Sequence, residues 1–93
     1  MREYELTLIY RPDLGDEGFT SLNDRIQGWV TGAGGDVLNV TTAGRKRLAF
    51  PIGHFRDGYY TVMQVRSRPD SVEDVERHLK LSEDVIRHMF IRR

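Results

Sequence analysis

Residues 36–67 read DVLNVTTAGRKRLAFPIGHFRDGYYTVMQVRS. The first part, Asp36 to Ile52, predicts a long strand that is interrupted or bent near Gly44, because glycine inside a strand often marks a bulge. Residues 54–58 end in Asp-Gly, a turn signal, and Tyr59 to Ser67 predicts the next strand. The stretch is therefore expected to form a β-hairpin, and the rest of the fold can be placed around it.

The segments before the hairpin predict a strand and a helix. Apolar and polar residues alternate over residues 3–10, which is typical of a half-buried strand. Apolar residues then recur at intervals of three and four, and Gly34-Gly35 ends this helical period. The helical apolar positions are Phe19, Leu22, Ile26, Trp29, Val30 and Ala33.

The segments after the hairpin predict a second helix and a last strand. Pro69 stops the hairpin, and Val72, Val75 and Leu79 mark a short helix with an acidic outer face. Residues 85–92 predict the last strand. The resulting α+β order, β-α-β-β-α-β, is the ferredoxin-like arrangement, in which two helices cover one face of a four-stranded antiparallel sheet. A chain of 93 residues fits a single domain, 1–93.

Composition excludes several classes of protein. The chain has no cysteine, so it can form neither a disulfide nor a thiolate metal site. Its apolar runs are only a few residues long, far short of a membrane span. The first residues run straight into a strand pattern with no signal peptide, so a cytoplasmic location is expected.

Charge is balanced overall but divided by segment. There are 14 basic and 14 acidic residues, a balance that by itself argues against nucleic-acid binding. Between Arg45 and Arg68, however, six basic residues stand against one acid, and from Asp70 to Asp84 six acids stand against two cations. The cations are therefore concentrated in the predicted hairpin.

Strand alternation predicts which residues occupy the face that the helices leave open. If Leu48, Phe50, Ile86 and Phe90 point toward the helices, other residues of their strands point away. The expected open face carries Ile9, Tyr60, Val62, Met89 and Ile91 beside Arg45, Arg47 and Arg87. Apolar groups interleaved with arginine are typical of a partner surface, although exposed apolar residues are also ordinary on a sheet.

The stretch Gly44-Arg-Lys-Arg-Leu-Ala-Phe-Pro-Ile52 is the most unusual one in the chain. Three consecutive cations in a strand repel one another and gain little from packing. Arginine suits bidentate contacts to phosphate, whereas charges also protect a solvated edge strand from aggregation. We favour phosphate contact.

The sequence predicts neither a catalytic site nor a metal site. His54, His78 and His88 fall on a turn, a helix and a strand without metal-ligand spacing, and the carboxylates of the second helix resemble a solvated face. We therefore expect no enzyme activity, no metal, no cofactor and no small-molecule substrate.

Several motifs together resemble the bacterial small-subunit ribosomal protein S-six family over essentially the whole chain. They are Met1-Arg-Glu-Tyr-Glu, Pro12 with Leu14, Gly44 to Ile52, Gly58-Tyr59-Tyr60 and Arg87-His-Met-Phe-Ile. The segment 44–52 is similar to the family signature Gly-x-Arg-Arg-Leu-Ala-Tyr-x-Ile, with Phe50 in place of tyrosine. The resemblance implies a ferredoxin-like fold, a place in the cytoplasmic ribosome, assembly with ribosomal protein S-eighteen, and binding of the pair to the central domain of small-subunit ribosomal RNA.

Given that resemblance, position suggests two groups of site residues. The expected RNA-binding cations are Arg2, Arg45, Lys46, Arg47, Arg92 and Arg93. The expected partner-binding residues are Tyr60, Val62, Arg87, Met89 and Ile91.

Two alternatives stay open at the level of sequence, since one fold hosts many functions. A ferredoxin-like regulatory or small-ligand-binding domain would need a pocket between subunits and polar groups at the helix starts. An acyl-phosphate hydrolase would need an anion-binding loop after the first strand, for which residues 11–17 are too acidic.

Overall fold

The computed structural model describes residues 1–93 and contains the predicted order of elements. The elements are β1 (Arg2–Tyr10), a short 3-10 turn η1 (Pro12–Leu14), α1 (Gly15–Gly32), β2 (Asp36–Ile52), β3 (Phe55–Ser67), α2 (Pro69–Leu81) and β4 (Val85–Arg92). The strands form one antiparallel sheet in the order β2-β3-β1-β4. The ferredoxin-like prediction is confirmed.

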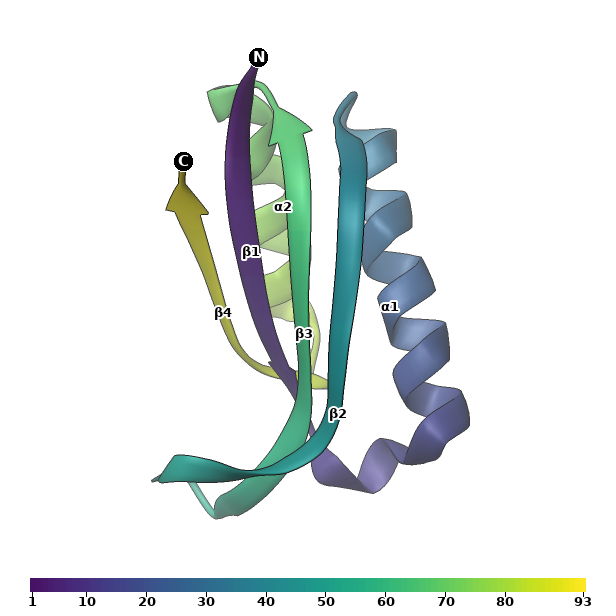
Figure 1. Cartoon of the computed structure of the whole chain (residues 1–93), viewed down its shortest axis with the longest axis vertical. Helices are drawn as coiled ribbons and strands as arrows, with labels where there is room; N and C mark the ends of the chain where they lie inside the picture. The colour runs from purple at the N-terminus through teal and green to yellow at the C-terminus, as the bar shows by residue number, and fades with distance from the viewer.

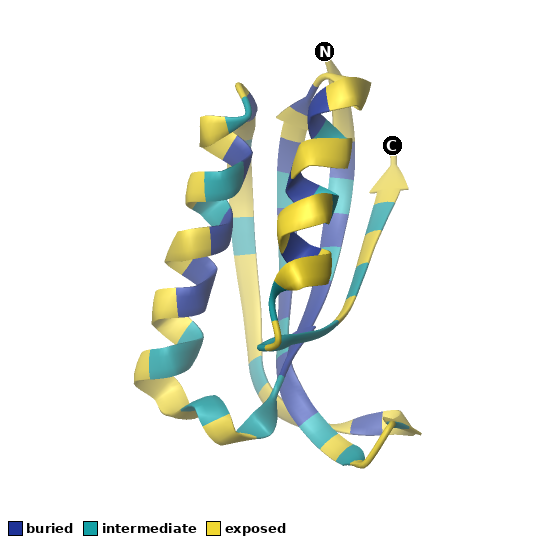
Figure 2. Ribbon diagram, turned by 180° about the vertical axis from the view of Figure 1, so that it is seen from behind, coloured by how far each residue is buried: buried dark blue, intermediate teal, exposed yellow.

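Both helices lie on one side of the sheet. Figure 1 views the sheet from its open side, with α2 behind the central strands, and Figure 2 shows the helices in front from the opposite side. Buried residues follow the inner stripes of the helices and alternate along β1 and β3 (Figure 2). Neither helix is long and apolar enough to cross a membrane.

The core forms where the apolar side of the sheet packs against the apolar sides of the two helices. Alternation defines the first, and a spacing of three and four residues defines the others. Along β1, Tyr4, Leu6, Leu8 and Tyr10 are all buried and face the helices, as alternation predicts. Facing residues of β3 complete each layer, for example Met63 opposite Leu6. On the helices, the inner positions recur at three and four residues: Leu22, Ile26 and Val30 on α1, and Val75 and Leu79 on α2.

One polar group interrupts this apolar core. Asn23 of α1 is only 6% exposed, and its Oδ1 accepts hydrogen bonds from the hydroxyls of Tyr10 (2.6 Å) and Thr61 (3.0 Å). Burial raises the pKa of Tyr10 above its ordinary value of 10.0, because the phenolate would lose its hydration, and a hydrogen bond with Thr61 opposes the shift only in part. The hydrogen bond that ties β1 to α1 therefore forms only while Tyr10 keeps its proton, whereas Thr61 ties β3 to α1 through a separate hydrogen bond.

Because of this shift in the pKa of Tyr10, the free energy of unfolding depends on pH in the alkaline range. Above about pH 10 an unfolded chain releases the Tyr10 proton while the folded chain keeps it, so the unfolded state binds fewer protons and stability falls as pH rises. The expected slope from this one group is about 1.4 kcal/mol per pH unit. Urea unfolding of the wild type and of Tyr10→Phe between pH 9 and 12 measures it. The free energy of unfolding of the wild type should fall relative to that of Tyr10→Phe as pH rises. A constant difference between the two would contradict the raised pKa of Tyr10.

Three local predictions about the hairpin and β4 are wrong. The hairpin turn lies at Gly53-His54, with Gly53 at φ 59°, so Asp57 and Gly58 belong to β3. Phe50 does not point into the core, since it is 77% exposed. In β4 a register shift opposite Ile9 and Tyr10 brings Val85 rather than Ile86 against the core.

Candidate protein- and nucleic-acid-binding surface

The sheet face away from the helices, here called the open face, brings all five predicted partner-binding residues together. Tyr60 and Val62 of β3 stand opposite Ile9 and Thr7 of β1, and residues of β4 stand on the other side of β1. The five residues are Tyr60, Val62, Arg87, Met89 and Ile91. Met89 is 47% exposed and Ile91 44%, so the face presents apolar surface to solvent. Its role in binding stays a prediction.

The outer part of the hairpin, residues 44–58, bends over one end of the open face, and we call it the hairpin arm. Gly44 has φ 73° and lies at a register shift between Thr42 and Gly44, so the strand kinks there (Figure 1). Leu48 is 8% exposed and Ile9 9%, although neither belongs to the core beneath the helices. They form a second, smaller apolar contact on the opposite side of the sheet.

A hollow of about 200 Å³ lies between the arm and the sheet. Most of its lining is apolar, and the residues are Thr7, Ile9, Leu48, Ala49, Phe50, Ile52, Tyr60, Arg87, His88 and Met89. The arm therefore deepens one end of the open face into a groove with Phe50 at its exposed rim.

Arg45 and Arg47 do not lie on the open face, which corrects the parity prediction. The alternation itself is right, because they point away from Leu48. Leu48, however, packs on the open side, so the arginines take the opposite side. In register they stand across from Tyr59 and Asp57 respectively.

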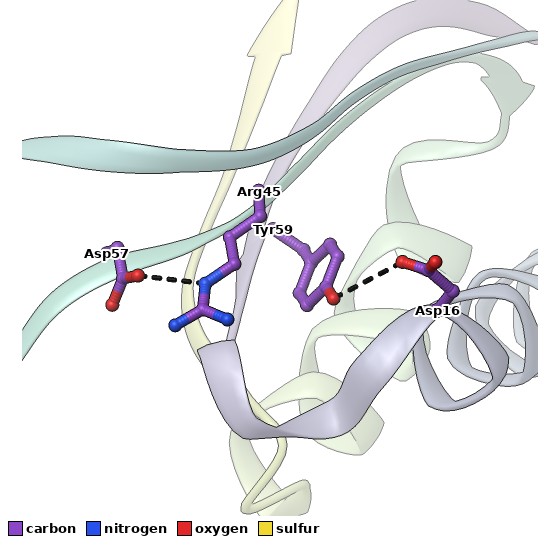
Figure 3. A network of polar contacts seen from close by, with 4 residues as sticks. All are labelled: Asp16, Arg45, Asp57 and Tyr59. Atoms are coloured by element: carbon purple, nitrogen blue, oxygen red, sulfur yellow. Dashed lines mark hydrogen bonds and ion pairs between the residues drawn. The ribbon is translucent and has the colours of Figure 1, made fainter.

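Figure 3 shows the surroundings of Arg45 on that side. Its Nε donates to Asp57 Oδ2 at 2.8 Å, in an ion pair that is about half exposed. The neighbouring Tyr59 hydroxyl donates to Asp16 Oδ1 at the start of α1, at a long 3.5 Å. An ion pair this exposed adds little stability and mainly holds the guanidinium in place.

Four cations gather at the arm, and we call them the hairpin-tip cluster: Arg45, Lys46, Arg47 and Arg56. They line one shallow hollow together with Asp57. Lys46, Arg47 and Arg56 form no ion pair, unlike Arg45. Sequence reasoning missed Arg56 as a site residue. The cluster depends on the pairing of Lys46 with Gly58 and Arg47 with Asp57, which the predicted turn at residues 54–58 did not allow.

The other predicted RNA-binding cations lie together at the opposite end of the sheet. Arg2, Arg92 and Arg93 line a shallow hollow with Met1, Glu3 and Arg66. Arg93 is held there, since its backbone N–H donates to the Glu3 carbonyl (3.0 Å) and its Nη1 to Gln64 Oε1 (2.7 Å). We call Arg2, Arg66, Arg92 and Arg93 the terminal cluster. Arg66, which also pairs with Asp36 at 3.4 Å, was not predicted as a site residue.

The side of the helices has the opposite character. Asp16, Glu17 and Asp24 surround a polar hollow on α1, and α2 carries further acids. Of the histidines, His78 stacks on Trp29 with ring centroids 5.1 Å apart and His54 lies against Phe55. No three histidine, aspartate or glutamate side chains come close enough to hold a metal ion.

The two alternative functions find little support in the geometry. The first turns of α1 and α2 carry acids, which repel the anionic groups that helix starts bind. In the loop after β1, Arg11 is committed to Asp84 (2.9 Å) and Asp13 (3.6 Å). The surface instead carries an apolar face between two groups of cations.

Comparison with known proteins identifies the family. A model of the family described as ribosomal protein S6 matches residues 3–92. The small ribosomal subunit protein bS6 of Moorella thermoacetica is 37% identical over 92 residues, covering 99% of this chain and 94% of that protein. Its counterpart in Carboxydothermus hydrogenoformans is 35% identical, covering 99% and 96%.

Solved structures agree. The crystal structure of 30S ribosomal protein S6 from Thermotoga maritima superposes with a TM-score of 0.94 at 26% identity, covering 99% of this chain and 87% of that one. The C-terminal domain of the MgtC protein from Mycobacterium tuberculosis matches with a TM-score of 0.65 at 14% identity, covering 100% and 88%, and shows the shared fold alone.

Fold and surface thus define a protein of the ferredoxin-like class with an exposed apolar sheet face. The chain belongs to the ribosomal protein S6 family, as the sequence motifs indicated. It is a protein of the small ribosomal subunit, and the expected roles in RNA binding and translation and the expected place in the ribosome follow from the family.

Proposed function

We propose that this chain acts as an assembly scaffold, binding small-subunit ribosomal RNA as a pair with ribosomal protein S-eighteen. The observation that carries the proposal is the open face, an exposed apolar surface beside Arg87 and bordered by the hairpin arm. Such a face on a monomer marks a protein contact. The hairpin-tip and terminal clusters lie at the two ends of this face, so one partner protein and RNA can be bound at the same time.

Electrostatics explain why a pair is needed. The chain is neutral overall, with 14 basic and 14 acidic residues, and two of its clustered cations are partly neutralised by Asp57 and Asp36. RNA affinity rises with the number of phosphates that a protein neutralises. The chain alone is therefore expected to bind weakly, and a basic partner on the open face adds the missing contacts. The shared interface then makes binding cooperative.

Within the pair, the open face binds the partner protein and the two clusters bind RNA. We assign Tyr60, Val62, Arg87, Met89 and Ile91 to the partner protein, with Leu48 and Phe50 of the arm closing one end of the groove. We assign RNA contact to Lys46, Arg47 and Arg56 at one end and to Arg2, Arg92 and Arg93 at the other. Arg45 is left out of this assignment because its guanidinium is paired with Asp57.

Affinity for a transcript of the central domain of small-subunit ribosomal RNA tests the scaffold. Filter binding measures this affinity for the chain alone and for the chain with purified S-eighteen. The partner is expected to raise the affinity at least roughly 10-fold, which is a coupling free energy of about 1.4 kcal/mol. The reciprocal measurement, S-eighteen with and without this chain, must give the same factor. Equal affinities with and without the partner would overturn the proposal.

A further inference from the structure

The unpaired cations of the hairpin and the termini lie at the two ends of the molecule. The chain extends 36 Å along its longest axis, which is vertical in Figure 1. Both chain ends lie in its upper part, and the arm forms the lower end (Figure 1). Three cations in each cluster form no ion pair: Lys46, Arg47 and Arg56 at the arm, and Arg2, Arg92 and Arg93 at the termini.

The spacing makes the two clusters electrostatically independent. Arg56 and Arg66 stand near the two ends of β3, Phe55–Ser67. At ~3.3 Å per residue the strand between them is about 33 Å long, and this is an upper limit of their separation because β3 bends into the arm (Figure 1). The screening length at physiological salt is only about 8 Å. A phosphate held at one cluster therefore does not feel the other.

The surface between the clusters offers no continuous row of cations for a single RNA backbone. On the open face, the intervening positions of β1 and β3 are neutral or acidic: Tyr60, Val62, Gln64, Glu3 and Glu5. The cation among them, Arg87 of β4, stands alone and is assigned above to the partner protein. On the side of the helices a phosphate chain would meet the acids of both helices, such as Asp16, Glu17, Asp24, Glu73 and Asp74. Like charges across a contact repel.

We propose that the chain is a two-ended RNA clamp, in which the hairpin-tip and terminal clusters bind phosphates of two separate RNA segments. This inference rests on the proposed rRNA binding and deepens it. The sheet is the rigid spacer, and the partner protein occupies the open face between the ends, Arg87 included. Binding at one end raises the effective concentration of the second segment at the other end, so the clamp favours an RNA fold that presents both segments at this distance.

Directed cleavage locates the two ends, because the chain has no cysteine and each introduced one is unique. His54→Cys lies in the turn of the arm, Glu3→Cys beside the terminal cluster, and Glu73→Cys on exposed α2 as control. Each variant carries a tethered iron chelate that produces hydroxyl radicals and is bound with S-eighteen to the RNA transcript. Cleavage is expected in two different RNA segments from positions 54 and 3, with little from position 73.

Charge removal measures the contribution of each end. Two triple variants are compared: one has alanine at Lys46, Arg47 and Arg56, and the other has alanine at Arg2, Arg92 and Arg93. Each variant should bind the RNA roughly 10-fold or more weakly. The slope of log affinity against log salt concentration should fall by about 2, since each lost phosphate contact contributes about 0.7–0.9. The control removes as many cations from the helices: Arg25→Ala, Arg77→Ala and Lys80→Ala, which should change binding less than 3-fold.

Failure of the clamp and failure of RNA binding give different results. Normal affinity with cleavage from only one end, or with both ends cleaving the same segment, would overturn the clamp and leave the scaffold standing. No cleavage from any position together with no measurable affinity would overturn the scaffold itself. Equal losses in both cluster variants and in the helix control would show that net charge, not two defined ends, controls binding.

Discussion

Replacing Asn23 with leucine is expected to destabilise the fold by about 2–4 kcal/mol, because two buried hydroxyls lose their acceptor. Tyr10 and Thr61 both donate to Asn23 Oδ1, and all three side chains are buried. For a small domain whose total stability is about 5–15 kcal/mol, this is a large fraction. Urea unfolding at pH 7 measures it. Ser21→Ala, an exposed substitution on the same helix, should stay within about 0.5 kcal/mol of the wild type.

A triple variant separates lost hydrogen bonding from altered packing. Combining Asn23→Leu with Tyr10→Phe and Thr61→Val removes the two orphaned hydroxyls together with their acceptor. Replacing all partners of a buried polar group with apolar ones costs far less than leaving some unpaired. The triple variant should therefore be more stable than Asn23→Leu alone. If it is less stable by the sum of the single losses, the polar contacts do not explain the role of Asn23.

Replacing Met89 with aspartate is expected to weaken binding of S-eighteen roughly 100-fold, because a carboxylate would be desolvated at the centre of the proposed contact. Met89 stands opposite Thr7 on β1 and lines the hollow beneath the arm with Leu48 and Phe50. It is 47% exposed in the free chain, so the substitution leaves the core intact. Calorimetric titration with purified S-eighteen gives the affinity, and circular dichroism checks the fold.

A matched substitution on the other side of the molecule provides the control. Leu81 at the end of α2 is 77% exposed and apolar, and Leu81→Asp introduces the same charge away from the open face. It should change the affinity for S-eighteen less than 3-fold. Equal losses for Met89→Asp and Leu81→Asp would show that the open face is not the contact. Phe50→Ala should produce a smaller loss than Met89→Asp, since Phe50 stands at the rim of the hollow.

Much of the fold could be predicted because local patterns and tertiary packing agree. The alternation of Leu6 and Leu8 on β1 and the three-and-four spacing of Leu22 and Ile26 on α1 each define an apolar side, and these sides pack together. The shared face of Tyr60, Val62, Arg87, Met89 and Ile91 was likewise predicted correctly, because β1, β3 and most of β4 keep a regular register. Their role in partner binding stays a prediction.

The errors fall where the register is irregular. A shift of one residue moves every following side chain to the other face of a strand. The shift near Gly44 and the bend of the arm together reverse the expected faces of Leu48, Arg45 and Arg47, and the shift opposite Ile9 and Tyr10 exchanges Val85 with Ile86. The predicted Asp-Gly turn at residues 57–58 failed for a related reason, because Gly53 supplied the positive φ instead.

By itself, the sequence determined the order of the elements, the apolar side of each, the family and the neutral total charge, all of which depend on residue type and spacing. Only the tertiary structure decided where the charges stand. Because β2 pairs with β3, Arg56 lies beside Lys46 and Arg47. Because the two termini lie at the same end of the sheet as the end of β3, Arg66 lies beside Arg2, Arg92 and Arg93. These neighbours are distant in sequence, and local periodicity carries no information about contacts that strand register and chain bending create.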